Sequence, residues 1–276
     1  MRIDSHHHLW NYSPEQYAWI TPEMSRLRCD YTPSDLEHEL KAQGIDGSVT
    51  VQARQSLEET RWLLQIAQDS PFIRGVVGWL PLADRAIRSD LEEWSQHELL
   101  KSIRHVVQDE ADDAFLLRAD FNAGIRLLKE FDLVYDILIY AKHLPNTITF
   151  VDQHPEQPFV LDHIAKPTIR AAQFDQRWAE QLRELAKRPQ ITCKFSALVT
   201  EVRDPEWDSE LLRPYWEVAL ESFGPQRLMF GSDWPVCLLR SETARWVATV
   251  EAFSASLSAA EQAAVWGGTA TRVYQL

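Results

Sequence analysis

The sequence predicts a (β/α)₈ barrel, an α/β fold, and three observations lead to it. The chain has 276 residues, which is long for a typical domain but suits a barrel that commonly needs about 250 residues. Short apolar runs alternate with helix-like segments, and no Gly/Ser linker or low-complexity stretch divides them. Several runs are apolar on both faces, as parallel strands covered by helices are. We therefore expect one barrel domain over residues 1–276.

Eight runs are predicted to be strands, and each is followed by a helical pattern. They cover residues 2–10, 47–53, 73–82, 100–108, 133–140, 159–167, 191–198 and 228–235. Strands that alternate with helices in this way are typical of a barrel or of a doubly wound parallel sheet. No GxGxxG motif follows any strand, which makes the doubly wound sheet the weaker alternative.

The helical patterns between these runs begin with recognisable start signals. Residues 32–35 read TPSD, which combines a capping threonine with a proline in the first turn. Ser56 with Glu59, and Ser258 with Glu261, have the spacing of a capping box. These signals place helix starts shortly after predicted strands, as the barrel requires.

Composition and charge limit the classes of partner. The formal net charge of −13 argues against nucleic acid or an anionic membrane as a partner. The three cysteines are widely spaced and odd in number, so they suggest no disulfide framework and no cysteine zinc site. No signal peptide, lipidation motif or apolar run of membrane-spanning length is present. We expect a soluble, cytoplasmic protein with a small-molecule partner, and the oligomeric state is left open.

The first predicted strand contains IDSHHHLW, residues 3–10. Side chains alternate between the two faces of a strand, so Asp4, His6, His8 and Trp10 share one face and His7 lies on the other. The informative unit is therefore a His-x-His pair. Two other interpretations of these histidines are a tag remnant and an ordinary polar strand end.

Two further strand ends carry groups that could do chemistry. His163 follows the apolar part of 159–167, and Asp233 stands in GSDWP near the end of 228–235. Each could be structural on its own, the histidine as a packing residue and the aspartate as a partner of loop N–H groups. The carboxyl ends of barrel strands meet at one mouth, so we expect His6, His8, His163 and Asp233 to converge there. Such a set could bind a divalent ion, or could polarise a carbonyl and take a proton from water.

Longer motifs carry a family resemblance. IDSHHHLW, YAWI at 17–20, LDHIAKP, CKFSAL, MFGSDWP and the closing GGTATRVYQL occur in this order over most of the chain. Together they resemble the lactonase branch of the amidohydrolase superfamily, which includes sugar-acid lactonases and pyrone-dicarboxylate lactonase. The resemblance implies a distorted (β/α)₈ barrel that hydrolyses cyclic esters, such as L-fuconolactone or L-rhamnonolactone.

The same resemblance assigns roles to the four strand-end residues. By position, His6 and His8 are the pair of the first strand, His163 the histidine of the sixth and Asp233 the acid of the eighth. We expect Asp233 to act as general base on the attacking water. The three histidines are expected to hold the carbonyl oxygen, or a metal that polarises it.

Whether a metal is needed is a separate question. Binuclear members of the wider superfamily carry a bridging lysine on the fifth strand, and VYDILIYAKHLP (134–145) does not resemble such a strand. A single zinc on His6, His8 and Asp233 is one alternative. A lactone is an activated ester, however, and an oxyanion donor contributes about 10²–10³ and a general base about 10²–10⁴ in rate. We therefore expect that no metal or other cofactor is required.

Further candidates for substrate binding lie beside these motifs. They are Arg104, Gln52, Lys194, Trp10, Trp234 and His143. An alternative for Arg104 is a purely interior ion pair. Only Arg104 and Arg54 lie near predicted strand ends, so a neutral or singly charged lactone is favoured over a dicarboxylate. Two other functions remain as alternatives: a zinc-dependent decarboxylase of the same superfamily, and a non-catalytic sugar-binding barrel.

Overall fold

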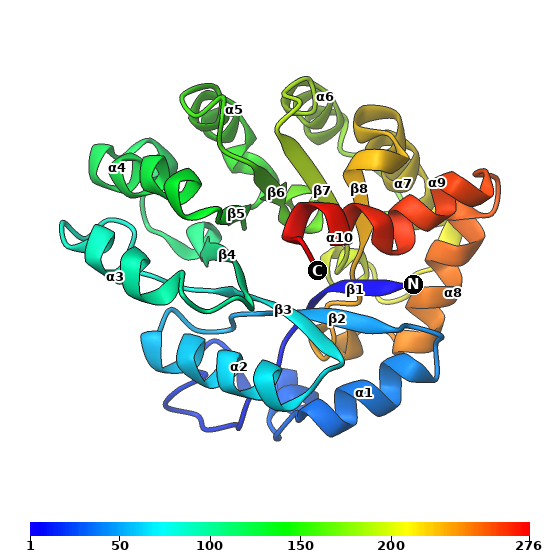
Figure 1. Ribbon diagram of the computed structural model, residues 1–276. Coiled ribbons are helices and arrows are strands. Elements are labelled where there is room, and N and C mark those ends of the chain that lie inside the picture. Colours follow the sequence, from blue (N-terminus) through cyan, green and yellow to red (C-terminus); the bar gives the residue numbers. More distant parts are fainter.

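A computed structural model describes residues 1–276 and contains one sheet of eight parallel strands in the order of the sequence. Figure 1 shows the strands around a central axis with helices outside them. The strands are β1 (Ile3–His7), β2 (Gly47–Val51), β3 (Ile73–Gly78), β4 (Leu100–His105), β5 (Val134–Ile137), β6 (Phe159–Leu161), β7 (Ile191–Phe195) and β8 (Leu228–Phe230). The predicted barrel fold is confirmed.

Helices follow the strands and cover the outside of the barrel. They are α1 (Pro33–Lys41), α2 (Leu57–Asp69), α3 (Ile87–Trp94), α4 (Ala119–Leu128), α5 (Leu144–Asp152), α6 (Gln176–Leu185), α7 (Ser209–Phe223), α8 (Thr243–Ser254), α9 (Ala259–Ala263) and α10 (Thr269–Tyr274). No helix is both long enough and apolar enough to cross a lipid bilayer.

The barrel is closed between β1 and β8 by a few specific contacts. Trp234, beyond the end of β8, forms an isolated parallel bridge with His7. The Asp233 N–H donates to the His6 carbonyl oxygen at 2.8 Å. Deeper in the same seam, Asp4 accepts hydrogen bonds from the backbone N–H and the hydroxyl of Ser232. These contacts fix the His-x-His segment against the segment that carries Asp233.

The lower part of the barrel interior is apolar. A cluster of strand residues fills it together with two residues of α10: Ile3, Val49, Val51, Val77, Val134, Val160, Met229, Ala270 and Tyr274. In Figure 1, α10 lies across the end of the barrel near the N-terminus. Because this end is packed with apolar side chains, a small-molecule site is expected at the opposite, C-terminal end of the strands.

All eight strands were predicted, but the sequence placed their ends too late. β6 ends at Leu161 rather than at 167, and β8 ends at Phe230 rather than at 235. After Leu161 the backbone turns, and the four residues 163–166 all have positive φ between 47° and 62°. The turn stays buried, because Ile164 and Ala165 are fully covered. An apolar run therefore continued beyond the strand and concealed the turn.

The predicted helix starts are present, with one difference. Both Thr32–Asp35 and Ser258–Glu261 form reciprocal capping boxes. Ser56 also caps its helix, but the Glu59 side chain does not return to it. Glu59 instead accepts the backbone N–H groups of residues 53 and 54, at 3.0 and 2.7 Å. This buried carboxyl group thereby fixes the loop that leaves β2 toward the cavity.

Candidate active site

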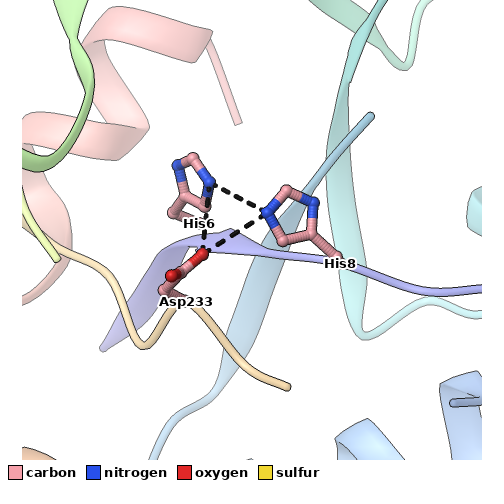
Figure 2. Close-up of side chains that lie close together, drawn as sticks. All are labelled: His6, His8 and Asp233. Carbon is pink, nitrogen blue, oxygen red and sulfur yellow. Dashed lines mark hydrogen bonds and ion pairs between the residues drawn. The ribbon is translucent and has the colours of Figure 1, made fainter. Parts of the chain in front are cut away.

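The strand ends bring His6, His8, His163 and Asp233 together at the C-terminal mouth of the barrel. His6 Nε2 lies 3.3 Å from His8 Nε2 and 3.7 Å from Asp233 Oδ1. His8 Nε2 lies 3.4 Å from the same carboxylate oxygen. The rings of His6 and His163 are 4.4 Å apart between centroids. Figure 2 shows the imidazoles of His6 and His8 and the Asp233 carboxylate directed toward one point.

A hydrogen bond behind the His8 imidazole determines which of its ring nitrogens faces this point as an acceptor. His8 Nδ1 lies 2.8 Å from the Val51 carbonyl oxygen, which can only accept, so Nδ1 carries the proton and Nε2 carries the lone pair. His6 lies between charged groups: Asp162 Oδ1 and the Lys194 ammonium are 3.3 and 3.2 Å from Nδ1, and the Arg104 guanidinium is 3.3 Å from Nε2. Because donors face both nitrogens of His6, these contacts select neither tautomer of that ring.

Three possible ligand atoms converge at this point: the Nε2 atoms of His6 and His8, and Asp233 Oδ1. The circle through the three atoms has a radius of about 2.0 Å, which is the length of a zinc–nitrogen or zinc–carboxylate bond. Their mutual distances of 3.3–3.7 Å are also those of neighbouring ligands around one tetrahedral ion. The residues present fit one divalent ion of zinc size.

Asp233 is held in a backbone conformation that is unusual for a residue other than glycine. Its φ is 56°, and its N–H donates to the His6 carbonyl oxygen at 2.8 Å. Burial alone would raise the pKa of Asp233, but His163, His8 and Lys166 act against it, and the net shift is downward. The carboxylate is therefore ionised at neutral pH.

Burial has the opposite effect on the histidines. It lowers the pKa of His163 to about 3 and holds the pKa of His6 well below its ordinary value. Both rings are therefore neutral at neutral pH, and a neutral imidazole has one N–H to donate and one lone pair. His163 Nδ1 lies 2.8 Å from the Ser196 hydroxyl, which can donate to it and leave the Nε2 proton of the ring available to a substrate.

A cavity of about 720 Å³ opens above this cluster. His8, His163 and Asp233 line it, and so do the predicted substrate-binding residues Gln52 and Arg104. This volume is in the range of small-molecule sites, which span about 300–1,000 Å³. Arg104 combines both interpretations that the sequence left open, because it faces the cavity and also donates to Asp162 Oδ2 at 2.9 Å.

Four predicted substrate-binding residues do not line the cavity. Trp10 is buried in a small aromatic cluster and donates to the Cys29 carbonyl oxygen, and Trp234 packs edge-on against Tyr31. His143 is turned outward, with Nε2 3.2 Å from Asp113. Lys194 lies lower in the barrel and is fully buried. Strand alternation or proximity to a motif placed each of these residues near the site. Neither showed how deep its side chain lies in the barrel or which way it points.

Several residues that the structure places at the site were given no role from the sequence. The Asp162 carboxylate accepts a hydrogen bond from Arg104 and lies beside His6, and Lys166 lines the cavity. Both stand in LDHIAKP next to His163, among the polar groups at the end of the sixth predicted strand. Ser196 and Asp136 had no comparable signal, since a serine and an acid within apolar strands also serve structural roles.

Comparison with known proteins identifies the family. Residues 3–276 match the family described as Amidohydrolase. The chain belongs to the amidohydrolase family. This amidohydrolase is 43% identical to the L-fucono-1,5-lactonase of Burkholderia multivorans, over 100% of this chain and 96% of that protein. It is 32% identical to the L-fucono-1,5-lactonase of Burkholderia ambifaria, again over 100% of this chain and 96% of that one.

A solved structure is also similar to this amidohydrolase. The crystal structure of an amidohydrolase from Burkholderia multivorans with bound zinc has a TM-score of 0.94 and 43% identity, with 100% of this chain and 99% of that chain covered. The expectation that no metal is required is wrong in the light of this zinc-bound relative and of the His6–His8–Asp233 donor set. The expectation rested on the low barrier to lactone opening and gave too little weight to three ligand atoms that converge at one point.

Proposed function

We propose that this amidohydrolase opens the ring of a sugar-acid lactone with water, and that L-fucono-1,5-lactone is its substrate. One observation carries the proposal: His6 converges with His8 and Asp233, which line a cavity, in a chain 43% identical to an L-fucono-1,5-lactonase over its whole length. That arrangement is suited to the hydrolysis of an ester bond, in which a carbonyl must be polarised and water activated.

His6 Nε2, His8 Nε2 and Asp233 Oδ1 are the atoms that would hold a single zinc ion. When bound there, the ion supplies Lewis acidity, which polarises a carbonyl oxygen and makes water a better nucleophile. The carbonyl oxygen of Val51 and the carboxylate of Asp162 hold the imidazoles behind it, through His8 Nδ1 and His6 Nδ1. Such outer partners fix the ring orientation and the tautomer of metal-binding histidines.

Asp233 and His163 have separate roles in the hydrolysis. Asp233 takes the proton of the attacking water with its second carboxylate oxygen, while the water oxygen forms a bond to the lactone carbonyl carbon. His163 donates its Nε2 proton in a hydrogen bond to the carbonyl oxygen as negative charge develops there. The bond between the carbonyl carbon and the ring oxygen then breaks, and the ring oxygen leaves as a hydroxyl group with the proton returned by Asp233.

The charges around the cavity favour a neutral lactone over a dicarboxylate. Three basic side chains line the cavity (Arg54, Arg104 and Lys166), against five acidic ones (Glu15, Glu58, Asp109, Glu110 and Asp233). Arg104 is already engaged by Asp162. The lining side chains themselves therefore offer few free cations to a substrate with two carboxylates, whereas the acidic side chains can accept hydrogen bonds from sugar hydroxyl groups.

The test is a panel assay that follows proton release from freshly prepared lactones at low buffer concentration. Zinc-loaded protein is expected to hydrolyse L-fucono-1,5-lactone, and to act more weakly on L-rhamnonolactone and pyrone dicarboxylate. His163→Gln should lose most of this activity, and His143→Gln is the matched control, because His143 is also buried but lies outside the cavity.

The two other functions give different outcomes in the same experiment. Release of carbon dioxide from an aromatic carboxylate, without lactone turnover, would indicate the decarboxylase. Tight binding of sugar lactones without proton release would indicate a binding barrel. Either result would refute the proposed hydrolysis.

A further inference from the structure

Lys194 is a fully buried lysine on β7, directly below the candidate active site. Its ammonium nitrogen lies 2.5 Å from Asp136 Oδ2, 3.0 Å from Asp162 Oδ1 and 3.2 Å from His6 Nδ1. These three partners come from β5, from the turn after β6 and from β1. A lysine in this position is costly to bury and is tolerated only because opposite charges surround it.

The charges around Lys194 form a balanced set. Two carboxylates, Asp136 and Asp162, face two cations, Lys194 and Arg104. Asp136 is held from two further sides, by the hydroxyl of Ser102 at 2.6 Å and by that of Tyr274 at 2.7 Å. The Tyr274 contact connects the set to α10, the helix that closes the lower end of the barrel.

The donors around the ammonium resemble a second cation site. Besides His6, His8 and Asp233, a second group of possible ligands contains His6, Asp162 and His163, with ligand atoms within 4.8 Å of one another. Two members of that second group, His6 and Asp162, are in contact with Lys194. His6 thus belongs to both groups, with Nε2 toward the first and Nδ1 toward the second.

We propose that the Lys194 ammonium permanently occupies the second cation position of this barrel and thereby restricts the site to a single metal ion. The proposal rests on the proposed zinc site and adds a role for Lys194 as a positioning residue. Its single charge stabilises the Asp136 and Asp162 carboxylates, which in turn hold His6. A divalent ion in the same place would place excess positive charge beside His6, Arg104 and the first ion.

The test counts the metal ions that stay bound. Wild-type protein and variants are loaded with excess zinc, passed through gel filtration, and analysed for zinc per chain by mass spectrometry. Wild type is expected to keep one ion. Lys194→Ala removes the ammonium, leaves Asp136 and Asp162 with only Arg104 as a counter-charge, and is expected to keep two ions. Lys166→Ala, which removes a cavity lysine without opening the buried position, is the matched control and should keep one.

The double variant Lys194→Ala/Asp136→Asn restores the charge balance and removes one donor, so it should return to one ion. Two ions in wild type, or one ion in folded Lys194→Ala, would overturn the proposal. If Lys194→Ala does not fold, the wild-type protein is loaded with manganese and its electron paramagnetic resonance spectrum is recorded. The spectrum of one isolated ion supports the proposal, and that of a coupled pair of ions overturns it. None of these results depends on lactone turnover, so failure of the proposed function is seen separately in the panel assay.

Discussion

Replacing Asp233 with asparagine is the most direct test of the mechanism. The side chain introduced by Asp233→Asn has nearly the shape of the carboxylate and could leave a neutral oxygen 3.4 Å from His8 and 3.7 Å from His6. It lacks the second anionic oxygen that takes the proton of water. Loss of a general base costs about 10²–10⁴ in rate, or about 3–5 kcal/mol of transition-state stabilisation. We expect kcat to fall by that factor when zinc is saturating.

The Michaelis constant should change far less, because Asp233 is one of 21 residues that line the cavity. The assay is steady-state proton release from L-fucono-1,5-lactone at several zinc concentrations, which separates weaker metal binding from slower chemistry. Asp113→Asn is the control, since Asp113 also faces a histidine, His143, but lies outside the cavity. If Asp233→Asn keeps more than about a tenth of kcat at saturating zinc, the assignment of the base is wrong.

Three further predictions concern the metal, the hydroxyl behind His163 and a buried acid. Removal of metal with a chelator should abolish more than about 90% of lactonase activity and zinc should restore it, since a Lewis acid contributes several kcal/mol to catalysis; full activity in metal-free protein would contradict the zinc site. Ser196→Ala should lower kcat about tenfold or more through the tautomer of His163, and Ser196→Thr should rescue it, whereas equal loss in both variants would point to packing. Burial raises the pKa of Asp4 to about 7 from an ordinary value of 3.8, so its contribution to stability is complete below pH 3.8 and is lost as pH rises through about 7; Asp4→Asn should therefore reduce the fall in urea-unfolding free energy between pH 5 and pH 8, by about 3 kcal/mol, and an unchanged fall would refute this.

Most of the eight strands could be predicted because they are apolar runs between polar segments, whereas β1 reads IDSHH and was indicated by the alternation of its side chains. Their ends could not, because the turns that carry the site are themselves buried. Ile164 and Ala165 are as well covered as the strand before them, although their φ values are positive. The hydrophobicity of a residue indicates that it is buried, but it does not indicate whether the backbone continues as a strand or turns. The least predictable positions are therefore those at which the chain leaves the sheet to form the site.

Alternation along a strand selected the correct face for His6, His8 and Arg104, but it carried no information about depth. Arg104 pairs in register with Asp136 near the end of β4 and reaches the cavity. Lys194 pairs with Met229, a residue of the apolar interior cluster, and stays below the cavity. Both side chains point into the barrel, and only the three-dimensional register shows that Arg104 lines the cavity and Lys194 does not.

The metal expectation failed for a related reason. The sequence allowed an estimate of how much catalysis a lactone needs, and that need is modest. It could not show that the Val51 carbonyl fixes the proton of His8 on Nδ1, nor that His6, His8 and Asp233 place their ligand atoms within 4.8 Å of one another. A carboxylate oxygen and a ring lone pair directed at one point favour a cation there, because opposite charges attract strongly at a buried site. The fit of the site to a metal ion therefore depends on how the donors are held, which the difficulty of the reaction does not reveal.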